Sequence, residues 1–193
     1  DKQLVGMTAI EWHFPNQDVP QLARETYLSS LVDLVDHIHL RHDADVALFT
    51  FTLGRDYGRN DEGISQELLS RVANPERIRL VRSTDPREIK GMLGNLEAFV
   101  GSRMHSNIFA LGASTPVLAI AYLPKTTGIM EMLGLSDHTV SIDTINTDAL
   151  IASFDDLWEE REVVRSHITN ALPQLEERAR NNASLAVELG KSE

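Results

Sequence analysis

An arginine and a histidine two residues apart are the side chains of this chain best suited to chemistry. A short apolar run over residues 98–101 ends at a glycine, and Arg103 and His105 follow it. A segment with apolar residues at helical spacing, 104–113, begins at the same point. The pattern predicts a buried strand that delivers a cation and a proton donor to the start of a helix.

The start of a helix favours an anion, because it carries about half a positive charge and unpaired amide donors. A phosphate or carboxylate held there would also meet the planar fork of Arg103. His105 could then exchange a proton with the bound group near neutral pH. Ser102 and Ser106 flank the pair and are candidate substrate ligands. Spacing alone equally allows an ion pair between Arg103 and an acidic neighbour, with His105 an ordinary helix residue.

Two further stretches follow expected strands and carry candidate substrate ligands. Lys125 and Thr126 come after the apolar run 116–121, at the start of another expected helix. A lysine there can act as a point charge on a phosphate, although a solvated lysine in a turn has the same pattern. His13 lies in the aromatic loop 11–16 after the first expected strand. That loop would either wall a crevice or cover the first helix.

Three other histidines, His37, His39 and His42, have spacings that resemble those of metal ligands. They fall at one helix end, where histidines also favour the helix dipole. Because no carboxylate–histidine pattern accompanies them in the sequence, we expect no metal site.

Six apolar runs alternate with segments of helical spacing. The expected strands are 4–10, 46–51, 78–81, 98–101, 116–121 and 139–142, and the expected helices are 18–39, 62–73, 85–94, 104–113, 126–133 and 147–154. Residues 155–189 read as largely helical with an interruption near Pro173, 155–162 as a linker, and 54–63 as a mobile glycine-rich loop. Strands that are apolar throughout indicate an α/β fold with a doubly wound, Rossmann-like parallel sheet of about six strands.

Composition narrows the class of protein. The 193 residues carry a formal net charge of −11 and no cysteine. The charge disfavours nucleic-acid binding, and the lack of cysteine excludes disulfides and thiolate chemistry. No apolar run is long enough to span a bilayer and no signal-peptide pattern opens the chain, so we expect a cytoplasmic protein. Because residue 1 is aspartate and a strand pattern starts almost at once, we expect a fragment cut at a domain boundary.

Residues 85–135, DPREIKGMLGNLEAFVGSRMHSNIFALGASTPVLAIAYLPKTTGIMEMLGL, resemble the polysaccharide pyruvyl transferase family. The shared series is a helix, a strand ending in Gly-x-Arg-x-His, a small-residue helix, Pro-Val, and a Tyr-x-Pro-Lys turn. Walker, dinucleotide and Gly-x-Ser-x-Gly motifs are absent from the sequence. The resemblance covers about fifty residues at the level of motif and most of the chain at the level of layout.

The resemblance implies one half of a GT-B fold, with residues 1–160 as the donor-binding carboxyl-terminal domain. Residues 161–193 would pack on an amino-terminal domain outside this chain. The family transfers pyruvate from phosphoenolpyruvate to a glycan as a ketal, with no further cofactor. By resemblance, Arg103 binds the donor anion, His105 is the general acid, and Lys125 matches the family lysine. The isolated domain is expected to be inactive, because a GT-B site needs both lobes.

One departure from the family pattern stands at the end of the first expected strand. Many relatives carry an arginine where this chain has Ile10, followed by Glu11. His13 is a candidate substitute. Two alternatives stay open: a nucleotide-sugar-dependent GT-B glycosyltransferase with Glu131 on the ribose, and a non-catalytic binding domain derived from the family.

Overall fold

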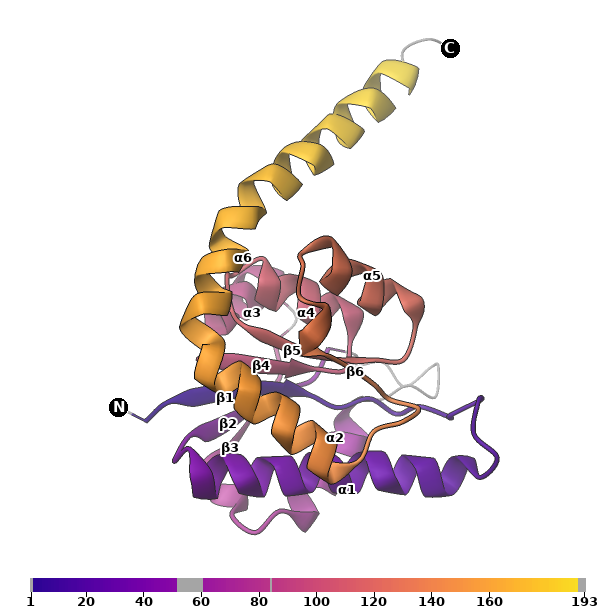
Figure 1. Ribbon diagram of the computed structural model, residues 1–193, viewed down its shortest axis with the longest axis vertical. Coiled ribbons are helices and arrows are strands. Elements are labelled where there is room, and N and C mark those ends of the chain that lie inside the picture. The colour runs from indigo at the N-terminus through magenta and orange to yellow at the C-terminus, as the bar shows by residue number, and fades with distance from the viewer. Residues whose placement is uncertain (1, 52–60, 84, 191–193) are drawn as a thin grey trace.

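Six parallel strands form one sheet in a computed structural model that describes residues 2–51, 61–83 and 85–190, the last eight of these by backbone alone. The strand order is β3-β2-β1-β4-β5-β6, the order typical of Rossmann-like sheets (Figure 1). The strands are β1 (Leu4–Thr8), β2 (Asp45–Phe49), β3 (Ile78–Val81), β4 (Ala98–Gly101), β5 (Val117–Ala121) and β6 (Thr139–Ser141). The expected doubly wound sheet is therefore confirmed.

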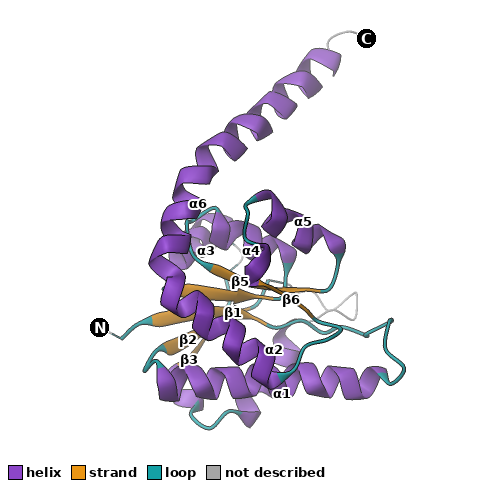
Figure 2. Ribbon diagram, viewed as in Figure 1, coloured by secondary structure: helices purple, strands orange, loops and turns teal. Residues whose placement is uncertain are grey.

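Helices cover both faces of this sheet (Figures 1 and 2). They are α1 (Pro20–Arg41), α2 (Asp61–Arg71), α3 (Pro86–Leu93), α4 (Met104–Leu111), α5 (Pro124–Met132) and α6 (Thr147–Gly190), with short 3₁₀ turns η1 (Pro75–Arg77) and η2 (Ser136–His138). Helices α1 and α2 lie on one face with the first part of α6, and α3, α4 and α5 lie on the other. No helix in the described part of the chain combines the length and apolarity that crossing a bilayer requires.

The central strands are buried on both faces, which explains their unbroken apolar sequences. β1 lies between β2 and β4, with Val5 opposite both Val46 and Ala98. The chain order reverses between β1 and β4, because β2 and β3 extend the sheet to one side and β5 and β6 to the other. Ligands of open α/β sheets bind outside the carboxyl ends of the strands at such a point.

Local sequence signals position the helices and strands around the switch point between β1 and β4. Asp85 caps α3, because its carboxylate accepts a hydrogen bond from the Arg87 amide at 2.8 Å and Pro86 occupies the first turn. Gly101 is the last residue of β4. A side chain is not tolerated there, because a β-carbon would overlap the Asn107 side chain, which donates a hydrogen bond from Nδ2 to the Gly101 carbonyl. The glycine thus lets the first turn of α4 sit directly on the strand end.

The carboxyl-terminal region differs from expectation, because α6 is one continuous helix through the expected linker and through Pro173. The linker prediction was wrong because Leu157, Trp158, Val164 and Ile168 recur at helical spacing and are buried. Pro173 is exposed, so water can hydrate the carbonyl that loses its helical partner. Of the loop expected over 54–63, residues 54–60 lie outside the described residues and 61–63 begin α2.

Helix α6 is fastened to the sheet by Arg165, whose guanidinium donates to the carbonyls of Leu96, Glu97 and Ser114. The helix therefore packs on the body beyond residue 160, and its last part projects away from it (Figure 1). The domain division at residue 160 stays a prediction.

Candidate functional site

Four of the residues singled out in the sequence line one cavity of about 260 Å³ near the carboxyl ends of β4 and β5. Arg103 and His105 come from the β4–α4 connection, and Lys125 and Thr126 from the start of α5. Met104, Tyr122 and Leu123 complete the lining. The fold thus brings together two cationic side chains, a histidine and a hydroxyl that lie about twenty residues apart in the sequence.

Two helix starts face this cavity. Arg103 is the N-cap of α4 and Leu123 that of α5, and neither N-cap residue forms a side-chain cap. The Thr126 side chain is 1% exposed, and its hydroxyl finds no hydrogen-bond partner within the described residues. An unpartnered buried hydroxyl is costly, and a ligand in the cavity would satisfy it. The cavity has the features of a small anion site.

Arg103 is held by Asp61, the first residue of α2. The guanidinium Nε lies 2.7 Å from Asp61 Oδ2, and the second nitrogen, Nη2, bonds Oδ1. The ion-pair alternative is therefore realised, and the same arginine still lines the cavity. Sequence reasoning missed Asp61, because a separation of 42 residues carries no periodic signal.

Ser102 and Ser106 are fully buried and are absent from the cavity lining, which differs from their expected role as substrate ligands. The Ser106 hydroxyl donates to the Arg103 carbonyl at 2.7 Å, and the Ser102 hydroxyl lies 2.8 Å from the Tyr27 hydroxyl. The Ser102 amide donates to the Thr8 hydroxyl at 3.0 Å, and that hydroxyl lies 3.2 Å from the Ser106 hydroxyl. The buried serine hydroxyls therefore belong to the network that holds the turn.

Tyr27 links α1 to both strand ends at the site. Its hydroxyl accepts a hydrogen bond from the Ile10 amide at 3.1 Å and contacts Ser102. Complete burial raises the pKa of Tyr27 to about 12, although both hydrogen bonds act in the opposite direction. A neutral tyrosine therefore supports the turn that carries Arg103.

Ile10 and Glu11 follow β1 at the position where the sequence departs from the family pattern. Ile10 is buried, and Glu11 instead binds Arg24 of α1 at 2.6 Å. His13 is exposed and stacks on Trp12, with ring centroids 5.1 Å apart. It lines a separate hollow with Arg24, so the structure does not bring it to the Arg103 cavity.

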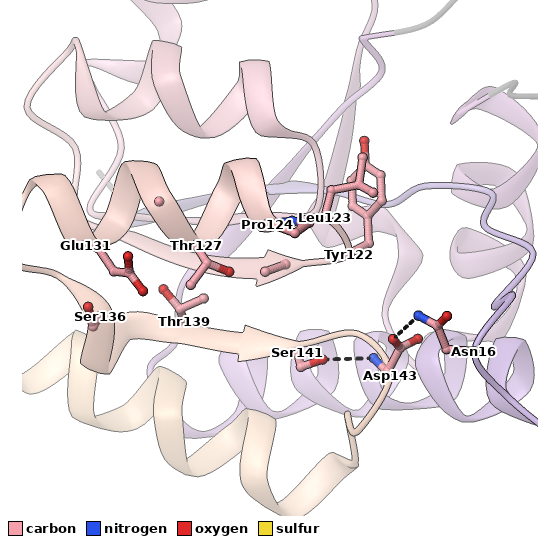
Figure 3. Close-up of a pocket in the computed structure, with 12 residues that line it drawn as sticks. Asn16, Tyr122, Leu123, Pro124, Thr127, Glu131, Ser136, Thr139, Ser141 and Asp143 are labelled. Atoms are coloured by element: carbon pink, nitrogen blue, oxygen red, sulfur yellow. Dashed lines mark hydrogen bonds between the residues drawn. The ribbon is translucent and has the colours of Figure 1, made fainter.

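A larger hollow of about 670 Å³ adjoins the first cavity and shares Tyr122 and Leu123 with it. Figure 3 shows Thr127 and Glu131 of α5 facing Ser136 and Thr139 across this hollow. At its other end Asn16 donates a hydrogen bond to Asp143 at 2.9 Å. All side chains that line it are neutral or acidic, as the full lining shows: Asn16, Ala121, Tyr122, Leu123, Pro124, Thr127, Gly128, Glu131, Ser136, Thr139, Ser141 and Asp143. Sequence reasoning had singled out only Glu131 among them for a sugar contact.

The histidine cluster requires a correction. The expectation that no carboxylate accompanies the three histidines was wrong, because Asp155 of α6 contacts both His37 and His42. Asp155 lies more than a hundred residues from the histidines in the chain, so the sequence pattern did not indicate this contact. His39 instead points into the protein, where burial is the main cause of its lowered pKa.

Comparisons with known proteins agree with this arrangement. The family model of polysaccharide pyruvyl transferases matches residues 13–124. The amylovoran biosynthesis protein AmsJ of Erwinia amylovora is 27% identical over 130 residues, which make up 67% of this chain and 31% of AmsJ. The chain thus spans about a third of the length of that relative.

Solved structures are similar in fold. An O-GlcNAc transferase mutant from Thermobaculum terrenum matches with a TM-score of 0.59 and 16% identity, over 90% of this chain and 32% of the other. MnaA of S. aureus, in a co-structure with UDP, matches with a TM-score of 0.58 and 15% identity, over 89% and 41%. These likenesses confirm a Rossmann-like α/β domain of the GT-B kind. With its family model matched over more than half its length and the Gly-x-Arg-x-His turn at the sheet's switch point, this chain belongs to the polysaccharide pyruvyl transferase family.

Proposed function

We propose that this chain is the donor-binding, carboxyl-terminal domain of an enzyme that transfers pyruvate from phosphoenolpyruvate to a glycan as a ketal. The observation that carries the proposal is one small cavity that gathers two cations, a histidine and an unpartnered hydroxyl at two helix starts. Phosphoenolpyruvate bears a phosphate and a carboxylate on three carbons, and such a small anion needs this density of donors.

The residues that line the cavity have separate roles in donor binding and proton transfer. Arg103 and Lys125 hold the anionic groups, and the Thr126 hydroxyl donates to one of their oxygens. His105, exposed in the first turn of α4, gives its proton to the methylene carbon of the donor. One acceptor hydroxyl then adds to the neighbouring carbon, and a second displaces phosphate to close the ketal. The two hydroxyl protons pass to His105 and to the departing phosphate.

The adjoining hollow suits the acceptor. Its hydroxyls, amide and two carboxylates, Glu131 and Asp143, can accept and donate hydrogen bonds to sugar hydroxyls. The carboxylates would repel a second phosphate, so a neutral part of the glycan fits best. Because the chain spans about a third of AmsJ, we propose that activity needs further protein that contributes the rest of the site.

Donor binding is the direct test. Phosphoenolpyruvate is titrated by calorimetry into the full-length protein and into its Arg103→Ala and Lys125→Ala variants. Each variant should weaken binding at least about tenfold, because a charge-assisted hydrogen bond is worth roughly 1.5–3 kcal/mol. Lys2→Ala is the matched control, since Lys2 pairs with Asp43 and Asp45 at the amino-terminal edge of the sheet. No binding by the wild type, or equal binding by Arg103→Ala, would refute the proposal.

His105 requires a different readout. His105→Gln should retain donor affinity and lose transfer by roughly 100- to 10,000-fold, because it removes a general acid and leaves the cations in place. Unchanged biological activity of the intact protein with His105→Ala would instead favour a non-catalytic binding domain.

A second candidate, a nucleotide-sugar glycosyltransferase, is favoured by the adjoining hollow with Glu131 at its side. Arg103 and Lys125 would then bind a diphosphate and Glu131 a ribose. A thermal-shift screen separates the two functions. Stabilisation by UDP or GDP, with none by phosphoenolpyruvate, would favour this second function.

A further inference from the structure

A second group of side chains able to do chemistry lies away from the donor cavity. Helix α1 runs from the carboxyl end of β1 to the amino end of β2, so its last turn lies at the opposite edge of the sheet. His37 lies just before that turn and His42 caps it, and Asp155 of α6 packs against both.

The three side chains converge on one point. Asp155 Oδ1 lies 2.8 Å from His37 Nε2 and 2.7 Å from His42 Nε2, and Oδ2 lies 3.1 Å from His37 Nε2. One nitrogen or oxygen of each residue lies within 4.8 Å of the others. Within the described residues, Asp155 forms salt bridges only to these two histidines. No lysine or arginine therefore neutralises the carboxylate in this part of the structure.

We propose that His37, His42 and Asp155 form a binding site for a divalent transition metal ion, with zinc the ion best matched to the donors. Imidazole nitrogen and carboxylate oxygen are common zinc ligands, and three protein ligands leave a fourth position for water. The metal takes the place of the protons that the imidazoles share with the carboxylate. The ligands must be neutral imidazoles and an ionised carboxylate, so binding weakens in acid.

Metal binding requires the three ligand atoms, which lie within 4.8 Å of one another, to rearrange locally. Zinc–ligand distances of about 2.0–2.1 Å at tetrahedral angles place ligand atoms about 3.3 Å apart. The present separations of 2.7 and 2.8 Å must therefore grow by about half an ångström. His37 and Asp155 are part-exposed and can make that shift. His42 is the more fixed ligand, because its ring packs on Phe154 and Trp158 with centroids 5.6 and 4.8 Å apart.

Such a site would join two helices that are distant in the chain. His37 lies in α1 and His42 is its C-cap, and Asp155 lies in the first turns of α6, before that helix projects away from the body. A metal bound there stabilises the native state, since the unfolded chain does not hold the three ligands together. This inference is independent of the proposed transferase activity.

The test uses the whole 193-residue chain after treatment with a chelator and dialysis. Zinc titrated by calorimetry should bind at one equivalent and raise the melting temperature. Asp155→Asn and His42→Ala should each lower the affinity by at least about 100-fold, because each removes a direct ligand, whereas outer-shell changes cost about 10- to 100-fold. Asp156→Asn is the matched control, since Asp156 is the exposed neighbour on the same helix, and His13→Ala controls for adventitious histidine binding.

Cobalt(II) provides a test that needs no variant. The wild-type chain should develop the intense visible absorption of a tetrahedral cobalt site and lose it when zinc is added. Absence of that spectrum, or equal zinc affinity in wild type and Asp155→Asn, would overturn the proposal and leave a hydrogen-bonded His–Asp–His cluster. Should His42→Ala fail to fold, His37→Gln at the more exposed position makes the same comparison.

Discussion

Replacing Arg103 with alanine should harm the fold as well as donor binding, and the two effects can be separated. Asp61 is completely buried and the Arg103 side chain is 17% exposed, so the pair between them is largely desolvated. Removal of one partner from a buried pair weakens the stabilisation of the charge that remains, which costs up to about 3–5 kcal/mol. Arg103→Ala should therefore lower the free energy of unfolding by about that amount.

Urea unfolding followed by circular dichroism measures this loss. For a domain of this size, each kcal/mol corresponds to about 2–4 °C in melting temperature, so we expect a decrease on the order of 10 °C. The double variant Arg103→Ala with Asp61→Asn should recover at least about half of the lost stability, because an amide tolerates burial better than a carboxylate that has lost its guanidinium partner. Phosphoenolpyruvate binding should stay lost in both variants.

The outcome is decisive in either direction. Equal stability of the single and double variants would show that the Asp61 charge does not depend on Arg103, and the argument from burial would fail. Recovery of donor binding in the double variant would show that Arg103→Ala acts on the donor only through the fold. Arg103→Lys, which keeps the charge and loses the planar fork, should fall between wild type and alanine in stability.

Three further predictions concern the supports of the site. The pKa of Tyr27 is raised from 10 to about 12, so the native state keeps a proton that the unfolded chain releases. Stability should thus fall between pH 10 and 12, by roughly 2–3 kcal/mol in total, and Tyr27→Phe should flatten that alkaline decline in urea midpoints measured against pH. Gly101→Ala should cost about 1–3 kcal/mol in urea unfolding and weaken donor binding, because the new methyl group overlaps Asn107; unchanged affinity would contradict the close approach seen at the end of β4. Arg165→Met should lower the free energy of unfolding by about 1.5–3 kcal/mol, since three backbone carbonyls lose a charged donor, and a melting temperature equal to that of wild type would refute this anchoring role.

Most of the sheet could be predicted because each strand corresponds to a short run of apolar residues in the sequence. The strands Ile78–Val81 and Ala98–Gly101 match the expected bounds, and the others differ by one or two residues at their ends. The cavity was also accessible to sequence reasoning. Strand ends of a parallel sheet lie along one edge, so Arg103 and Lys125 had to meet once their strands were neighbours.

The differences between the structure and the expectations from sequence come from features that periodicity does not report. Ser102 and Ser106 have the composition of ligands, but the strand-to-helix turn needs their hydroxyls for its own hydrogen bonds. The helix break expected at Pro173 did not occur, because the cost of a proline depends on whether solvent can reach the freed carbonyl. His13 follows its strand as predicted, yet its loop turns towards Arg24 and away from the cavity.

By itself, the order of residues determined the alternation of strands and helices, the family, and the turn that presents Arg103 and His105. The alternation of strands and helices and the turn follow from interactions between residues close together in the chain, and the family follows from their motifs. Only the tertiary structure decided that Asp61 holds Arg103 from 42 residues away, and that Asp155 completes the cluster of His37 and His42. Pairing between side chains on different elements depends on how helices pack across the sheet, and no local spacing encodes that distance.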